Sequence, residues 1–360
     1  MKKFVYRVLL AANAFFGAAL LISYLAVHIN PEVLALPAYF GLAYPYLLLI
    51  NIIFVIIWGA YLKFEAFISV IIIASGYTHL SNYIRVEKPL GDKTGTFKVL
   101  SYNLRLFNVY EGDKTNSENK VIAFLKLQKP DILCLQEFFI AGVPAQEEAS
   151  LSTDLGGNFY SHIKLIGNGR NRYYGIATYS RFPIIKKGEI IHPGSSSLSI
   201  FSDIVINKDT FRIFNNHLQS FRLKKMERSF IGELTSPGNN NETLDEVKSL
   251  SVSLKRGFIR RSVQAQSLKA QIDHSPYSVI VAGDFNDTPV SYAYRKIRKG
   301  LNDAFVNSGY GAGFTYKGNY PANRIDYILF DNSLESRYFE ILKVRFSDHY
   351  PVAAYFRKKD

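Results

Sequence analysis

Long apolar runs dominate the first quarter of the chain. Charged side chains are absent between Arg7 and Glu32, between Glu32 and Lys63, and between Glu65 and Arg85. Each gap has room for the roughly 20 apolar residues that a helix needs to cross a bilayer. We therefore expect a membrane region over residues 1–85 with about three transmembrane helices, near Val8–Val27, Tyr44–Tyr61 and Ala66–Ile84. A buried helical subdomain and, for residues 1–26, a cleaved signal peptide are the alternatives.

The basic residues around these runs predict their orientation. Lys2, Lys3 and Arg7 precede the first run, Lys63 follows the second, and the loop from about residue 28 to 45 has no Lys or Arg. Cytoplasmic loops are enriched in Lys and Arg. Three crossings of a bacterial inner membrane would thus place everything after Ile84 outside the cytoplasm, in the periplasm of a diderm cell. Two crossings would place it in the cytoplasm.

A polar linker at residues 86–97 leads into a region of frequent strands and intermittent helices. One helix is expected at Asn119–Gln128. Apolar β runs are expected at Phe97–Leu104, Asp131–Leu135, Ile176–Tyr179, Ile184–Ile191, Ile200–Ile206, Phe211–Asn215, Ser278–Ala282, Arg324–Phe330 and Pro351–Phe356. This order favours an α+β sandwich over residues 98–357, with sheets inside and helices outside, rather than a doubly wound parallel sheet.

An insertion at about residues 220–265 interrupts this pattern. Its flanks, Phe221–Arg228 and Lys255–Arg261, are basic and predict helices, whereas Thr235–Asn241 is polar and predicts a loop. These flanks offer a surface for anionic headgroups, although a solvated helix face is the commoner meaning of such runs.

Charge and cysteine usage narrow the function. The net charge is +13. Most of it lies after the membrane region, which suits anionic lipid headgroups or phosphate-bearing substrates. Cys134 is the only cysteine and lies in an apolar β run, so it is expected to be a buried thiol. A lone cysteine excludes an intramolecular disulfide and a Cys-rich zinc site.

Polar side chains follow the apolar β runs repeatedly. They are Asn103, Gln136-Glu137, Asn216-His217, Asp284 with Asn286, Asp326, and Asp348-His349. Strand ends are where a sandwich directs side chains into a shared cleft. Each cluster alone is ordinary for a turn or cap, but acids, amides and two histidines recurring in this way indicate one catalytic site.

These clusters resemble, in order, the motifs of the endonuclease/exonuclease/phosphatase family, which includes pancreatic-type deoxyribonucleases, abasic-site endonucleases, inositol-polyphosphate 5-phosphatases and neutral sphingomyelinases. The matching segments are Ser101–Asn103, Leu135–Glu137, Gly175–Pro183, Asn216–Leu218, Gly283–Asn286, Arg324–Tyr327 and Ser347–Pro351. The resemblance spans about Lys98 to Phe356. It implies a four-layer α/β/β/α sandwich and the hydrolysis of a phosphoester with a divalent metal, Mg²⁺ or Mn²⁺.

The resemblance and the chemistry of phosphoester hydrolysis imply a role for each matching residue. Glu137 would ligate the metal, with Asn103 and Asp348 as further ligands. Asp284 would accept a proton from the attacking water, and Asn286 would hold that water or a phosphate oxygen. His349, oriented by Asp326, and His217 would contact the phosphoryl group. Which residue is the general base stays open.

Two further residues are candidates for substrate phosphate. Arg105 stands where abasic-site endonucleases usually have an acid, so this position offers no metal ligand. We expect the Arg105 side chain either to form a surface salt bridge or to face the anionic substrate as a cation. Tyr174 precedes the Gly175–Pro183 motif and is expected to reach the cleft or to pack at its rim.

The substrate class has competing interpretations. A phosphoester of a lipid headgroup or of another membrane-associated anion is favoured by the anchor, the charge and the sequence His217-Leu218-Gln219, which is similar to that of sphingomyelinase-type members. The alternatives are an anchored extracytoplasmic nuclease, a phosphomonoesterase on soluble sugars or inositols, and a non-enzymatic binding module.

Overall fold

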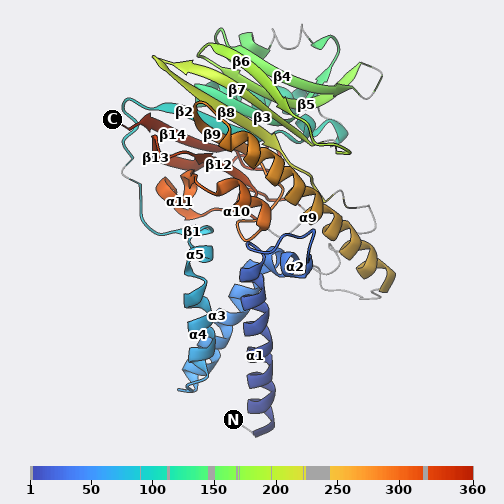
Figure 1. The fold of residues 1–360 in the computed structure, drawn as a ribbon, viewed down its shortest axis with the longest axis vertical. Coiled ribbons are helices and arrows are strands. Elements are labelled where there is room, and N and C mark those ends of the chain that lie inside the picture. The colour runs from blue at the N-terminus through green and yellow to red at the C-terminus, as the bar shows by residue number, and fades with distance from the viewer. Residues whose placement is uncertain are drawn as a thin grey trace.

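The computed structural model describes residues 3–359 apart from 90, 112–113, 145–150, 168, 170, 196, 222, 224–243 and 319–322. The N-terminal part is a bundle of helices that projects from one side of a β-sandwich (Figure 1). Its helices are α1 (Lys3–Leu25), α2 (Leu36–Leu42), α3 (Tyr44–Ala60), α4 (Ala66–Ser75) and α5 (Tyr77–Leu80). The N-terminus and the α3–α4 turn lie at the end of the bundle far from the sandwich.

The three predicted apolar helices are present, but their lengths differ from the prediction. Among the described helices, α1 alone is long and apolar enough to cross a membrane by itself. The pair α2 and α3, bent by 68°, meets the same test when taken as one span, whereas α4 has only ten residues. The third segment does not continue as one helix to Ile84, because it bends at Gly76 before the short α5.

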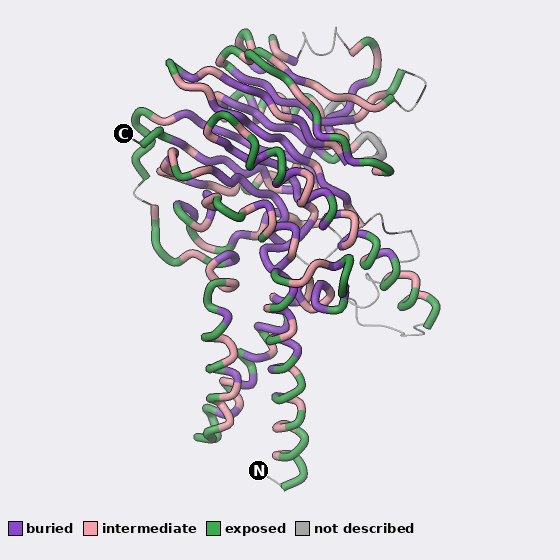
Figure 2. Tube along the Cα trace, viewed as in Figure 1, coloured by how far each residue is buried: buried purple, intermediate pink, exposed green. Residues whose placement is uncertain are grey.

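The bundle exposes large apolar side chains and buries one polar cluster between its helices. Large apolar side chains such as Phe15 and Ile56 are exposed on its outer faces, which are coloured green in Figure 2. Inside it, the fully buried Ser69 hydroxyl lies 2.7 Å from Oδ1 of Asn13 and 3.0 Å from Oδ1 of Asn51, which links α1, α3 and α4. A water-soluble helical bundle keeps its apolar stripe inward and covers its outer faces with polar side chains, whereas this bundle has apolar side chains both inside and outside.

Two six-stranded sheets form the sandwich. The first has the order β13 (Leu334–Ile341), β14 (Val352–Lys358), β2 (Phe97–Asn103), β3 (Ile132–Ala141), β5 (Arg172–Ser180) and β4 (Tyr160–Gly167). The second has the order β10 (Asn302–Asp303), β12 (Asp326–Phe330), β9 (Ser278–Asp284), β8 (Asp209–His217), β7 (Leu198–Ile206) and β6 (Ile184–Ile190). The pairs β2–β3 and β8–β9 are parallel, and the other neighbours are antiparallel.

Three apolar cores define four layers. The core between the sheets is built from residues such as Val99, Ile213 and Ile280. The outer face of the first sheet packs against α6 (Lys114–Gln128) and the 3-10 helix η1 (Arg105–Glu111). The outer face of the second packs against α9 (Leu244–Asp273) and α10 (Tyr292–Arg298), while α11 (Ala304–Ser308) contacts β12 and β13. The predicted α/β/β/α sandwich is therefore confirmed.

Several local predictions need revision. The predicted strands are present, and β3 and β5 are longer than expected. The strands β4 and β13 were not predicted. From Leu244 onward the basic insertion is a single 30-residue helix whose second half lies in the core, so Arg261 is buried rather than solvated. Nearly all of the predicted segment Phe221–Arg228, and all of Thr235–Asn241, lie outside the described residues. Cys134 is a buried thiol, as predicted.

The bundle docks onto the sandwich through specific contacts. The two-residue strand β1 (Ile84–Arg85) pairs with β11 (Gly311–Ala312). The side-chain Oδ1 of Asn82 accepts a hydrogen bond from Arg298 at 2.7 Å, and its main-chain oxygen accepts one from the buried Arg324 at 2.9 Å. At Gly41 a Cβ would lie 2.3 Å from the carbonyl oxygen of Val290, so only glycine permits this close approach.

Candidate active site

The polar clusters predicted from the sequence meet at one end of the sandwich. Residues Asn103 and Gln136 are register partners at the carboxyl ends of the parallel pair β2–β3, and His217 and Asp284 are partners at the ends of β8–β9. The antiparallel neighbours begin where these strands end. Asp326 is the first residue of β12 and pairs with Asp284, while His349 lies just before β14.

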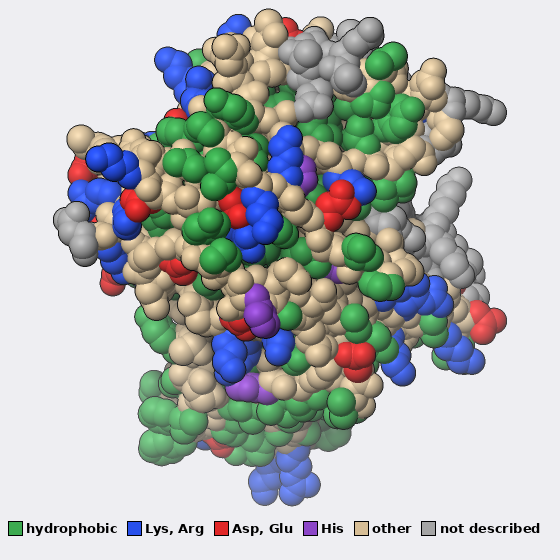
Figure 3. All heavy atoms as spheres, turned by 45° about the horizontal axis from the view of Figure 1, so that its top comes forward, with side chains coloured by type: hydrophobic (Ala, Val, Ile, Leu, Met, Phe, Trp, Pro, Cys, Tyr) green, Lys and Arg blue, Asp and Glu red, His purple; other side chains and the backbone are tan. Residues whose placement is uncertain are grey.

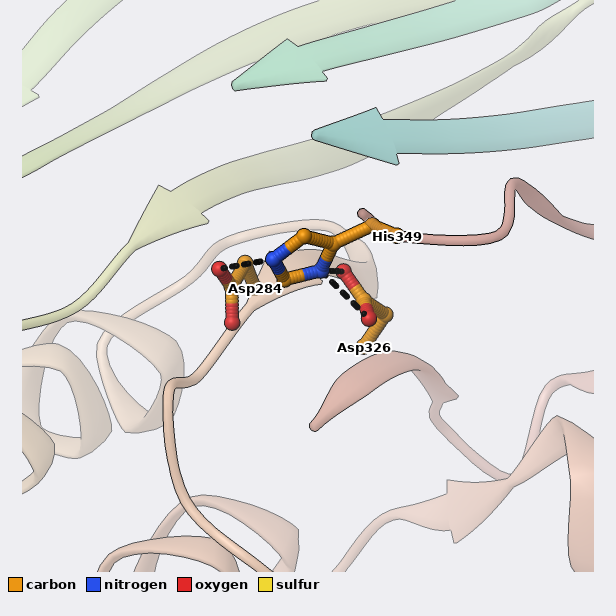
Figure 4. A group of neighbouring side chains, drawn as sticks. All are labelled: Asp284, Asp326 and His349. Carbon is orange, nitrogen blue, oxygen red and sulfur yellow. Dashed lines mark hydrogen bonds and ion pairs between the residues drawn. The ribbon is translucent and has the colours of Figure 1, made fainter. Parts of the chain in front are cut away.

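A buried row of three side chains forms the centre of this site (Figure 4). The Nδ1 atom of His349 lies 3.1 and 3.0 Å from the two carboxylate oxygens of Asp326. On the other side of the ring, Nε2 lies 3.8 Å from Oδ2 of Asp284. All three residues are at most 5% exposed. A carboxylate on Nδ1 fixes the tautomer of the imidazole and leaves Nε2 directed at Asp284.

Burial and neighbouring charges shift the pKa values of this row. Burial raises the pKa of Asp284 to about 6, although the positive charge of His349 opposes the shift. Burial alone would lower the pKa of His349, but the carboxylates of Asp326 and Asp284 outweigh it and raise that pKa to about 10. The row therefore contains a carboxylate able to accept a proton near neutral pH beside an imidazolium able to donate one.

Hydrogen bonds hold the Asp284 carboxylate in place. Its Oδ2 accepts from Nδ2 of Asn103 at 2.9 Å, and its Oδ1 accepts from the backbone N–H of Asn286 at 2.7 Å. The side chain of Asn286 donates to the carbonyl oxygen of Leu218 at 2.9 Å, which connects the turn after β9 to the loop after β8. In this structure Asn286 thus joins two loops of the site.

Glu137 reaches the site because β3 is irregular at this point. The pairing of β3 with β5 shifts between Leu135 and Phe138, and Glu137 has a φ of 48°. A bulge of this kind redirects a side chain that regular pleating would point elsewhere. The Oε1 atom of Glu137 lies 3.5 Å from Nδ2 of Asn103 and 3.5 Å from Nε2 of His217. Burial raises the pKa of the Glu137 carboxyl, so its negative charge is poorly compensated.

Of the remaining residues predicted from the sequence, Arg105 and Asp348 lie beside the buried row and Tyr174 does not. The Nε atom of Arg105 lies 3.4 Å from Oδ2 of Asp348. The Oδ1 atom of the same carboxylate lies 3.9 Å from Nε2 of His349. Tyr174 is placed apart from this group, on β5 opposite Phe139, and among the described residues it makes no contact with the row.

Three features of the site were not predicted. The ring of Tyr316 packs edge-on against His349 with centroids 5.1 Å apart, and the hydroxyl of Thr315 accepts from the backbone N–H of Asp326 at 3.1 Å. Between the sheets, Nε2 of the buried Gln136 donates to Oδ1 of Asn215 at 2.7 Å. The doublet Asn215-Asn216 carried a usable signal, since two amides inside an apolar strand require partners.

Helix α9 positions the loop that follows His217. The backbone N–H of Gln219 donates to Oε1 of Gln264 at 2.9 Å, and its carbonyl oxygen accepts from Nη1 of Arg261 at 2.8 Å. Nε of Arg261 also pairs with the carboxylate of Asp287 at 2.9 Å. The basic helix therefore fastens both the loop after β8 and the turn after β9.

The site is suited to a cation. Among the described residues, Asp284, Asp326 and His349 offer ligand atoms that all lie within 4.8 Å of one another. The metal ligands predicted from the sequence, Glu137, Asn103 and Asp348, are not in that set but adjoin it, since Asn103 contacts both Asp284 and Glu137 and Asp348 lies 3.9 Å from His349. The site brings four carboxylates together with two imidazoles and one guanidinium, and the excess of carboxylates and the oxygen-rich donors fit a hard divalent cation.

Comparisons with known proteins agree with this geometry. The model of the endonuclease/exonuclease/phosphatase family matches residues 100–349. A second family model, a domain of unknown function (DUF8431), matches residues 6–83. No curated protein matches the sequence.

Solved structures share the fold at low sequence identity. A family member from Leptotrichia buccalis C-1013-b is 15% identical with a TM-score of 0.52, over 72% of this chain and 99% of that one. The mannosyl-6-phosphatase of Bacteroides thetaiotaomicron VPI-5482 is 19% identical with a TM-score of 0.50, over 72% and 99%. The human Nocturnin catalytic domain with bound sulfate is 18% identical with a TM-score of 0.51, over 75% and 96%.

Proposed function

The chain belongs to the endonuclease/exonuclease/phosphatase family, whose members hydrolyse phosphoesters and use divalent metals, and from this premise we propose that it is a membrane-anchored, divalent-metal-dependent phosphoesterase. We assign its substrate to the phosphoesters of lipid headgroups or of other membrane-associated anions. The observation that carries the proposal is the buried row of Asp326, His349 and Asp284 at the ends of the central strands.

In the proposed reaction, Asp284 accepts the proton of the attacking water. Asn103 and the backbone N–H of Asn286 hold its carboxylate in a fixed orientation. The carboxylate therefore accepts the proton from a water molecule in one defined position. His349 donates a hydrogen bond from its Nε2–H to a phosphoryl oxygen, while the Asp326 carboxylate accepts a hydrogen bond from Nδ1–H. His217, 3.9 Å from Asp284, stabilises the charge that develops on the phosphoryl group.

Glu137 is the proposed principal ligand of the metal, with Asn103 and Asp348 beside it. The raised pKa of Glu137 supports this role, because a partly buried carboxylate whose charged form is disfavoured by desolvation is stabilised by a cation. Arg105 keeps Asp348 at the rim and adds a positive charge facing the substrate. When bound, the metal supplies Lewis-acid polarisation of the phosphoryl oxygens.

The membrane anchor is proposed for residues 1–85, followed by the linker at 86–97 and the catalytic domain at 98–357. The apolar outer faces of the bundle and its buried Ser69–Asn13–Asn51 cluster support this placement, since lipid favours an apolar exterior with polar contacts between helices. The α3–α4 turn, which contains Lys63, and the start of α1, which contains Lys3 and Arg7, lie at the end of the bundle away from the catalytic domain (Figure 1). This placement supports an extracytoplasmic catalytic domain at a bacterial inner membrane.

Headgroup and phosphate release would test this proposal. The detergent-purified full chain is assayed with Mg²⁺ on phospholipids, sphingolipids, inositol phosphates, phosphorylated sugars and DNA, beside Asp284→Asn and the exposed control Asp209→Asn. We expect lipid cleavage that disappears on chelation, returns with Mg²⁺ and falls at least about 10²-fold in Asp284→Asn only. Cleavage of DNA alone would replace the lipid assignment with an anchored nuclease. Metal-independent turnover would overturn the mechanism.

A further inference from the structure

A second polar pocket lies at the junction between the bundle and the catalytic domain. It has a volume of about 670 Å³. One wall comes from the ends of the bundle, with His28 after α1 and His79 in α5, and the other comes from α10 and the residues that follow it. None of the residues of the proposed catalytic row lines it, so it is a separate site.

The charge of this pocket is uniformly positive. Four cationic side chains line it, Arg295, Lys296, Arg298 and Lys299, together with the two histidines, and the described lining includes no Asp or Glu. Helix α10 ends in three of these cations, and attraction to its C-terminal dipole explains a cation or two in a last turn. It does not explain why the bundle adds two histidines and the hydroxyls of Thr78 and Ser81 to the same pocket.

The cations of the pocket differ in what holds them. The guanidinium of Arg298 is fixed by Oδ1 of Asn82 at 2.7 Å and by the hydroxyl of Tyr294 at 2.8 Å, so it forms part of the wall. Arg295 and Lys299 are exposed, and their side chains have no hydrogen bond or ion pair with any described residue. Like charges brought together without a counter-charge repel one another. An anion bound between them would remove that repulsion.

The position of the pocket points to the kind of anion. Directly below it, towards the bundle, apolar side chains are exposed, including Leu25 at 46% and Tyr77 at 65%. Figure 3 shows Lys, Arg and His side chains gathered just where the green apolar surface of the bundle begins. If the bundle crosses a bilayer, this level is that of the lipid headgroups, where each Lys or Arg gains about 1 kcal/mol with anionic lipid.

We propose that this pocket binds the phosphate of an anionic membrane lipid, with the acyl chains lying along the exposed apolar face of the bundle. The inference rests on the membrane placement proposed above but not on catalysis. A bound lipid would hold α10 and the ends of α1 and α5 together. The orientation of the catalytic domain above the membrane would then depend on the lipid as well as on the protein contacts.

The experiment measures lipid binding without turnover. The full chain, purified in a neutral detergent without divalent metal, is titrated with phosphatidylglycerol or phosphatidylcholine, and bound lipid is followed by native mass spectrometry. The variant Arg295→Gln/Lys299→Gln removes two exposed pocket cations. The control Lys248→Gln/Lys255→Gln removes the same charge from the exposed start of α9, which reaches down to the level of α2 (Figure 1).

We expect phosphatidylglycerol to bind more tightly than phosphatidylcholine and the pocket variant to lose about thirtyfold in affinity for it, with the control within about twofold of the parent. Equal losses in both variants, or no preference for the anionic lipid, would overturn the proposal. Inorganic phosphate is titrated in parallel. If it binds as tightly as the lipid, the pocket recognises a free anion and the lipid assignment is wrong. Extraction of the parent from membranes by carbonate alone would instead refute the membrane placement, independently of the catalytic assay.

Discussion

Replacing Asp326 with Asn tests whether the orientation of His349 is essential to the proposed reaction. Both carboxylate oxygens of Asp326 lie within 3.1 Å of Nδ1 of His349, and among the described side chains Asp326 is the hydrogen-bond partner of this nitrogen. Asparagine has nearly the same shape but no charge, and its NH₂ group can turn towards Nδ1. The imidazole would then lose the partner that keeps a proton on Nδ1 and directs Nε2 at the substrate.

The expected loss can be estimated from the geometry. A positioned acid or base contributes about 10²–10⁴-fold to a rate. In this variant Asp284 keeps its bonds to Asn103 and Asn286, so only the part due to His349 is lost. We expect kcat/KM to fall about 10³-fold, which corresponds to about 4 kcal/mol of transition-state stabilisation. The backbone N–H of residue 326 still reaches the hydroxyl of Thr315, so the start of β12 should remain in place.

The assay compares kcat/KM of the parent, Asp326→Asn and Asp209→Asn on the same phosphodiester at saturating Mg²⁺. Asp209 is a suitable control because it lies at the opposite end of β8 from His217, and within the described part of the chain its carboxylate forms an exposed pair with Lys358. Thermal unfolding of each variant shows whether the fold is retained. A folded Asp326→Asn protein with kcat/KM within about threefold of the parent would refute the role given to this pair.

Three further predictions concern the metal, the bundle and pH. Glu137→Gln should raise the Mg²⁺ concentration for half-maximal activity at least about tenfold; an unchanged titration would remove Glu137 as a ligand. Ser69→Ala should destabilise the bundle by about 1 kcal/mol, because the buried amides of Asn13 and Asn51 lose their shared donor; a transition unchanged in detergent denaturation would contradict this. Burial lowers the pKa of His162 to about 4, below its unfolded value of about 6.5. Stability should therefore fall as the pH drops through this window, by about 1–2 kcal/mol at pH 5, and an equal fall in His162→Gln would show that another group is responsible.

Strand ends were the part of the site that the sequence could predict well. An apolar run can be recognised by its periodicity and length, and the polar residue that follows it marks the end of a strand. Asn103, His217 and Asp284 are found in that way, because each is the last residue of a strand. Their mutual approach follows from two parallel pairs whose carboxyl ends point in the same direction, and this pairing was supplied by the family resemblance rather than by periodicity.

Features that depend on irregular backbone could not be predicted. Glu137 points into the site because β3 has a bulge there. Neither the bulge nor the φ of 48° at Glu137 can be recognised from the apolar residues around it in the sequence. Tyr316 packs against His349 from a polar stretch with neither helical nor strand periodicity. The third apolar helix was predicted to continue to Ile84, whereas in the structure it is interrupted at Gly76 and followed by the four-residue α5.

The contacts between bundle and sandwich connect the N-terminal bundle to the candidate site. Arg324 is fully buried, with one nitrogen of its guanidinium paired with Asp303 and another donating to the main chain of Asn82 at the end of the bundle. Two residues later the chain reaches Asp326, which holds His349. A displacement of the bundle would therefore act on the start of β12, because a buried guanidinium cannot lose a partner without a large free-energy cost. The N-terminal bundle is thus part of what fixes the orientation of the proposed catalytic histidine.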